Sequence, residues 1–93
     1  MDKYDYISSV ANRLAATGNQ MVAKDLADDL NTKSYTTDRG NEFVGGIGIY
    51  KVISTAYHRC EDAGRDQDAH NIAVSFTKPD GSFAWRDGDE DNE

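Results

Sequence analysis

The sequence predicts a small, mainly helical α+β domain with a short antiparallel sheet. Apolar residues recur at helical spacing in three separate segments of the chain. Between the second and third segments, a polar centre flanked by aromatic and β-branched residues is typical of a hairpin. Near the end, Lys78-Pro79-Asp80-Gly81 has the composition of a tight turn.

The three helical segments each keep their apolar residues on one face and end at a residue that is common after a helix. We therefore expect their apolar faces to pack together in one core. The segments and their ends are 7–14 with Gly18, 23–30 with Asn31, and 49–60 with Gly64. The expected core residues are Leu14, Leu26, Leu30, Val52, Ile53 and Tyr57.

The fourth apolar segment, residues 69–76, fits two periodicities. Ala69, Ile72, Ala73 and Phe76 have helical spacing, whereas every second residue from Ile72 to Phe76 is also apolar, as in a strand. We favour a helix, because two acidic residues precede the segment, where the first turn of a helix favours negative charge.

The expected sheet combines residues 35–44, which form the hairpin, with a strand at 82–85 that follows the turn. Residues 1–86 are expected to form a single globular domain, because 93 residues are too few for two domains. Residues 87–93 hold five acidic residues and no basic one, so we expect a mobile acidic tail.

Charge and cysteine content narrow the class of protein. The formal net charge is −7, but residues 1–86 hold 12 acidic and 10 basic residues, a net charge of −2. The single cysteine, Cys60, allows no internal disulfide, and the first residues lack the pattern of a signal peptide. We therefore expect a cytoplasmic protein without a membrane span.

The middle of the chain carries a family resemblance. A helix that ends in Leu30-Asn31 leads into a stretch with threonine, arginine and glycine, then Phe43, then a helix that contains Ile49 and Val52-Ile53. This order resembles the helix-turn-helix segment of the large serine recombinases. The resemblance implies a helix-turn-helix or winged-helix-like scaffold in which the second of the two helices contacts DNA.

Two departures from the family pattern lie where DNA contact would occur. Asp38 and Glu42 are acidic residues in a hairpin that is typically basic. At the start of the third helix, Gly45-Gly46-Ile47-Gly48 provides no side-chain donor for reading base edges.

Residue patterns that support catalysis or metal binding are scarce. The chain has no nucleophile elbow and no phosphate-binding loop with Gly-Lys-Ser/Thr. His58 and Cys60 are two residues apart on a helix, so their side chains diverge and cannot share a metal. We expect no enzyme activity, no cofactor and no metal, and we interpret Cys60 as a buried structural thiol.

Two function hypotheses remain. The first is a binding protein, such as a phage or mobile-element inhibitor in the style of anti-CRISPR and anti-restriction proteins, that docks on a basic surface of a nucleic-acid-handling protein. The second is a helix-turn-helix DNA-binding regulator or recombination accessory factor. The residues assigned to partner binding are Asp25, Asp28, Asp29, Tyr35, Asp38, Glu42, Glu61 and Asp62, and those assigned to DNA binding are Lys51, Ser54, Thr55, His58 and Arg59.

Overall fold

The computed structural model describes residues 2–37, 39–43, 47–78 and 81–83. These residues form a mainly helical domain with a small sheet, as the sequence predicts. In chain order the elements are α1 (Lys3–Thr17), β1 (Met21–Val22), α2 (Ala23–Thr32), α3 (Ile47–Asp62), α4 (Asp66–Ser75) and β2 (Phe76–Thr77).

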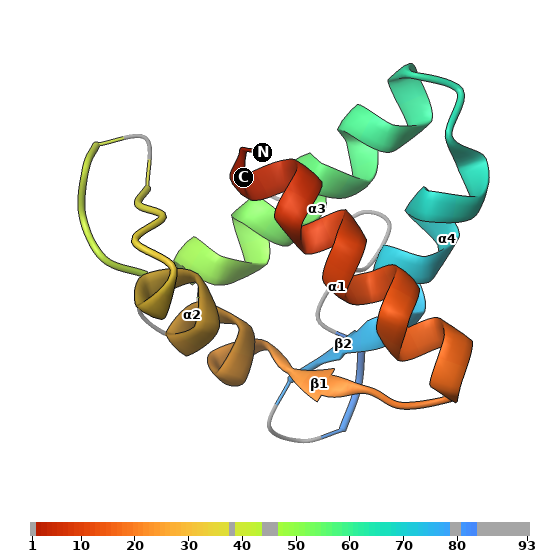
Figure 1. The fold of residues 1–93 in the computed structure, drawn as a ribbon, viewed down its shortest axis with the longest axis horizontal. Helices are drawn as coiled ribbons and strands as arrows, with labels where there is room; N and C mark the ends of the chain where they lie inside the picture. Colours follow the sequence, from red (N-terminus) through yellow and green to blue (C-terminus); the bar gives the residue numbers. More distant parts are fainter. Residues whose placement is uncertain (1, 38, 44–46, 79–80, 84–93) are drawn as a thin grey trace.

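The long helix α1 holds the domain together. It packs against both α3 and α4, which also pack against each other. Figure 1 shows α1 crossing in front of α3, with α4 on one side and α2 on the other. The two short strands lie beneath this layer, next to α2 and the end of α4.

Local contacts and backbone conformation explain where α1 begins and where α1 and α3 end. The N–H of Asp5 donates to the Asp2 side chain at 2.9 Å, which caps the start of α1. Gly18 ends α1 with φ of 71°, and Gly64 follows α3 with φ of 76°. Both adopt the left-handed conformation that a helix C-terminus favours in glycine, so the predicted ends at these two residues are confirmed.

The fourth apolar segment, residues 69–76, contains both a helix and the start of a strand, the two alternatives that its sequence allows. It is helical from Asp66 to Ser75, with Asp66 and Asp68 in the first turn, as predicted. The last apolar residue of the pattern, Phe76, begins β2 instead. The strand interpretation of residues 72–75 is therefore wrong, whereas a strand does begin one residue later.

The sheet differs from the predicted one in both its segments and its direction. Strands β1 and β2 are parallel, with Met21 opposite Phe76 and Val22 opposite Thr77. Phe83 forms one isolated antiparallel bridge with Thr77, and residues 84–85 lie outside the described part of the chain. The predicted turn before Phe83 is present, because the N–H of Gly81 donates to the Lys78 carbonyl at 2.9 Å.

The hairpin expected at 35–44 forms no strand among the residues described there. Its backbone groups have other partners: the N–H of Tyr35 donates to the Leu30 carbonyl at 3.0 Å, and the N–H of Thr37 donates to the Asn41 carbonyl at 2.8 Å. Residues that satisfy their backbone groups locally cannot pair with a neighbouring strand. The described residues of this segment therefore form an irregular connection after α2.

The core collects apolar side chains from all four helices, the α2–α3 connection and both strands. Four of the predicted core residues, Leu26, Leu30, Val52 and Ile53, are buried in it, and Leu14 and Tyr57 pack against it half-buried. The largest buried side chain is Phe76. None of the helices in the described residues is long and apolar enough to cross a membrane.

We predict that Ile53→Ala lowers the free energy of unfolding by about 2 to 4 kcal/mol, because it leaves a cavity at a fully buried position. Ile53→Val removes only one methylene group and should cost about 0.5 to 1.5 kcal/mol. Urea unfolding followed by circular dichroism measures both values. Equal losses in the two variants would mean that this site collapses around the smaller side chain.

Candidate functional site

A groove of about 420 Å³ opens beside the exposed side of α3. Three parts of the chain line it: the start of α1, the α2–α3 connection and the first half of α3. The described lining residues are Lys3, Tyr4, Thr37, Arg39, Phe43, Gly48, Lys51, Val52 and Thr55.

Positive charge converges on this groove. Lys3, Arg39 and Lys51 reach it from three different elements, and none of its described lining residues is acidic. Lys51 and Arg39 form no ion pair with the acidic residues that the structure describes. A concave surface lined by charges of one sign concentrates the electric field and attracts ligands of the opposite sign.

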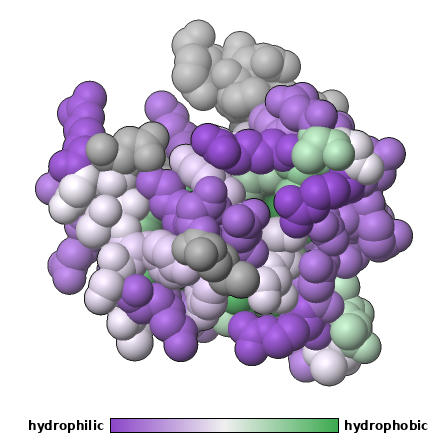
Figure 2. Space-filling view, turned by 45° about the horizontal axis from the view of Figure 1, so that its top comes forward, coloured by the Kyte–Doolittle hydropathy of each residue, from purple (hydrophilic) through white to green (hydrophobic). Residues whose placement is uncertain are grey.

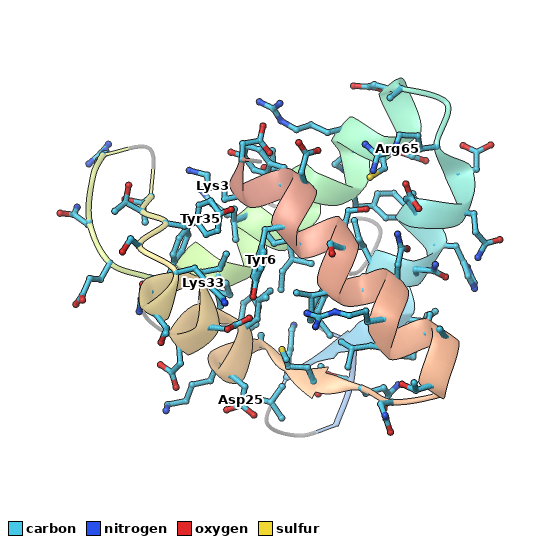
Figure 3. All side chains as sticks on the ribbon, viewed as in Figure 1. Lys3, Tyr6, Asp25, Lys33, Tyr35 and Arg65 are labelled. Carbon is cyan, nitrogen blue, oxygen red and sulfur yellow. The ribbon has the colours of Figure 1, made fainter. Side chains whose placement is uncertain are left out.

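Lys3 connects the start of α1 to the α2–α3 connection. Its ammonium group donates to the carbonyl of Thr36 at 3.0 Å and lies 5.4 Å from the Tyr4 ring centroid and 5.9 Å from that of Phe43. Figure 3 shows Lys3 and Tyr35 at the same end of α1. Because the side chain is tied to both elements, its charge is fixed beside the groove.

Tyr4 is also held in place before any ligand arrives. The guanidinium group of Arg59 lies 4.2 Å from the Tyr4 ring centroid, close enough for a cation–π contact. Arg59 follows Lys51 and Thr55 at four-residue spacing, so the three side chains form one stripe along α3. Tyr4 lines the groove and Arg59 does not, so Arg59 supports the ring from outside the groove.

Asn31 positions the opposite wall. Its side-chain amide donates to the Phe43 carbonyl at 2.7 Å, and its side-chain oxygen accepts from the Phe43 N–H at 2.7 Å. These two bonds pair a helix-end side chain with a backbone twelve residues further along the chain. They hold the buried Phe43 ring at the groove and bring Arg39 beside it.

Tyr6 joins α1 to α2 next to this wall. Its hydroxyl donates to the Asp29 carboxylate, and its ring lies 5.4 Å from the Tyr35 ring, centroid to centroid. Burial and this bond to Asp29 raise the pKa of Tyr6. Asp29 and Tyr35, both predicted to bind a partner, therefore contribute to the packing of α1 on α2.

The other acidic residues of the predicted partner surface do not gather in one place. Asp25 and Asp28 are exposed on α2, and Asp28 pairs with Lys24 at 3.7 Å. Glu42 is exposed in the α2–α3 connection, whereas Glu61 and Asp62 end α3 at the far side from α2 (Figure 1). Asp38 lies outside the described residues.

The predicted DNA-binding residues divide between two stripes of α3. Lys51 and Thr55 line the groove, and Arg59 continues the same stripe. Ser54 and His58 belong to the neighbouring stripe, where His58 contacts Glu61 at 3.2 Å. Sequence reasoning did not assign Lys3, Thr37 or Arg39 to a site, because only the folded chain brings them together beside α3.

Figure 2 shows that the described part of one face is mostly hydrophilic. Hydrophobic atoms appear on it only in small separate areas, some of them at the bottom of hollows. This face therefore offers charged and polar contacts around small apolar patches, which suits a charged ligand better than a broad apolar partner.

A second polar cluster surrounds the turn from α3 to α4. The Arg65 guanidinium donates to Asp68 at 2.7 Å and to Ser8 of α1 at 3.2 Å, and it lies 4.0 Å from Asp5. Cys60 is buried nearby, as predicted, and burial raises the pKa of its thiol although the charge of Arg65 opposes this. These contacts fasten α1 to the α3–α4 turn.

Among the described residues, no group of three or more histidine, cysteine, aspartate or glutamate side chains is arranged to hold a metal ion. Comparison of the chain with protein-family models, with curated proteins and with solved structures gives no significant match. Inferences about function therefore depend on the geometry of the groove.

We predict that Asn31→Ala lowers the free energy of unfolding by about 1 to 3 kcal/mol, because it leaves the backbone groups of the buried Phe43 without partners. Asn31→Asp keeps the acceptor for the Phe43 N–H but loses the donor to its carbonyl. Hydrogen exchange should therefore show the Phe43 amide protected in Asn31→Asp and exposed in Asn31→Ala. Similar protection in both variants would contradict this role.

We also predict that the Cys60 thiol resists alkylation in the native protein and reacts fast in denaturant. Its pKa is raised above the ordinary value of 9.0, so the folded state holds the proton more tightly than the unfolded chain. The resulting stabilisation is fully present below that value and is lost as pH rises through the raised pKa. Urea unfolding on either side of pH 9.0 should show this loss, and Cys60→Ala should reduce it.

Proposed function

We propose that this protein is a non-enzymatic, cytoplasmic nucleic-acid-binding domain with a helix-turn-helix-like scaffold, and that its groove binds the phosphate backbone. The observation that carries this proposal is the convergence of Lys3, Arg39 and Lys51 on one concave surface. Cationic side chains close to phosphates release condensed counterions, and this release supplies most of the sequence-independent affinity for nucleic acids.

The positions of these cations within the fold support the proposal. Arg39 and Lys51 both fall in the segment that resembles the serine recombinase helix-turn-helix, Arg39 in the connection between α2 and α3 and Lys51 in α3. Thr37 and Thr55 add hydroxyl groups to the same groove. Hydroxyl and basic side chains together are the groups that most often contact phosphate oxygens.

The net charge of −7 opposes binding to any polyanion. Local charge matters more than the total at short range, because ions screen charges beyond about 10 Å at moderate salt concentration. The exposed carboxylates Asp25 and Asp28 lie on α2, an element that does not line the groove, whereas Glu42 is exposed next to the lining residue Phe43 and reduces the local positive charge. We therefore expect binding that is weak overall and strongly dependent on salt.

A second candidate function is supported by the outer face of α2. Asp25 and Asp28 are exposed there, and Lys24 pairs with Asp28. Such a face could meet a basic surface on a nucleic-acid-handling protein, in the manner of phage-encoded anti-CRISPR or anti-restriction inhibitors. Exposed charge pairs are individually weak, and the remaining acidic residues lie apart, so the geometry supports this function less well.

We predict that Lys51→Gln and Arg39→Gln each weaken binding to a labelled oligonucleotide and reduce the slope of log affinity against log salt by about one unit. Fluorescence anisotropy at several salt concentrations measures both effects. The matched control is Lys24→Gln, which removes the same charge from α2 and should leave the slope unchanged.

Replacing Asp25 and Asp28 together with asparagine tests whether the acidic face of α2 takes part in nucleic-acid binding. This variant should bind nucleic acid at least as tightly as the native protein, because it loses only repulsion. If no nucleic acid binds at low salt, or if Lys24→Gln weakens binding as much as Lys51→Gln does, the groove is not a nucleic-acid site.

A further inference from the structure

We propose that the groove admits an unpaired nucleotide, so that the preferred ligand is single-stranded nucleic acid with a base stacked on Tyr4. This inference rests on the proposed function, because it specifies which form of nucleic acid the same groove takes. Three features of the groove carry it: its concave shape, the apolar side chains inside it, and the fixed position of Tyr4.

The groove is concave, whereas a protein that reads the bases of duplex DNA presents a protruding element. A recognition helix must protrude to enter a major groove about 12 Å wide. Here residues from the start of α1 and from the α2–α3 connection line the same groove as the exposed stripe of α3. A single strand or an unstacked base is narrow enough to lie in this groove.

The lining combines the two kinds of group that single-strand-binding sites use. Tyr4, Phe43 and Val52 supply aromatic and aliphatic surface, while Lys3, Arg39 and Lys51 supply positive charge around it. Bases stack on the aromatic rings of such sites while the phosphates follow the basic side chains. A site for phosphate alone needs no aromatic surface.

The size of the groove also suits a single nucleotide. It is an open groove of about 420 Å³, which leaves room for one base to lie in it. Gly48 contributes no side chain to the lining, and a Cβ atom built on it meets no atom within 4 Å. A ligand can therefore approach the backbone of α3 closely at this position.

Tyr4 is arranged to receive a base with little loss of conformational entropy. Arg59 holds the ring from outside the groove at 4.2 Å, and Lys3 lies 5.4 Å from its centroid. A side chain that is already ordered loses less freedom when a ligand binds. The neighbouring cations would also remain beside the phosphates of a nucleotide whose base stacks on the Tyr4 ring.

The experiment compares a labelled oligothymidylate with a duplex of the same length, in fluorescence anisotropy at low salt. We expect the single strand to bind at least about tenfold more tightly, a gain within the range of one stacked base. Tyr4→Leu should remove this preference, whereas Tyr4→Phe, which keeps the ring, should retain it.

Gly48→Leu provides an independent test, because it fills the groove without changing any charge. It faces open space, so the fold should tolerate it, and circular dichroism checks this. We expect this variant to lose single-strand binding while it keeps Lys3, Arg39 and Lys51. An excess of inorganic polyphosphate should displace the native complex poorly, because it provides charge without a base.

The outcomes separate the two proposals. If the duplex binds as tightly as the single strand, or if Tyr4→Leu and Gly48→Leu bind normally while Lys51→Gln does not, the inference is wrong and the proposed function stands. Efficient displacement by polyphosphate would show that the groove binds anions without recognising a base. The inference would then be wrong as well. If neither nucleic acid binds, both proposals are wrong.

Discussion

The pair of hydrogen bonds between the Asn31 side chain and the Phe43 backbone determines the course of the α2–α3 connection. The connection forms no strand in its described residues, so its course depends on these bonds together with its turn hydrogen bonds and the contact from Lys3 to Thr36. The bonds bring Phe43 into the core, and this places Arg39 and Thr37 opposite the start of α1. The groove therefore depends on the side-chain amide of Asn31, which forms with the Phe43 backbone the two hydrogen bonds that a neighbouring strand could otherwise provide.

The domain compensates for its small size with contacts between distant segments. A chain of 93 residues buries a limited core, so each element needs several kinds of support. Helix α1 provides much of it: Tyr6 bonds to Asp29, Lys3 bonds to Thr36, and Ser8 accepts from Arg65. These polar contacts join α1 to α2, to the α2–α3 connection and to the α3–α4 turn.

The helices were predictable because their signals are local. Apolar spacing located all four, and Gly18 and Gly64 marked two of their ends. The parallel pairing of β1 and β2 was not predictable, because each strand has two residues and the pairing joins positions more than fifty residues apart. Met21 and Val22 also continue the apolar pattern of α2, which concealed the strand in the sequence.

The candidate site was predictable only in part, for the same reason. Lys51, Thr55 and Arg59 share a stripe of one helix, so helical spacing was enough to group them. Lys3 and Tyr4 join them only through the packing of α1, which local spacing does not reveal. The acidic set was selected from composition, and composition carries no information about whether exposed carboxylates share a face.

The separation of charge between α2 and the groove has a consequence for how the molecule meets a polyanion. In most orientations, the overall negative charge repels an approaching strand. Attraction begins only when the groove faces it, within a screening length of Lys3, Arg39 and Lys51. If the groove binds nucleic acid as proposed, the protein would accumulate little along nucleic acid that it touches with its other faces, and the acidic residues would select the orientation in which it binds.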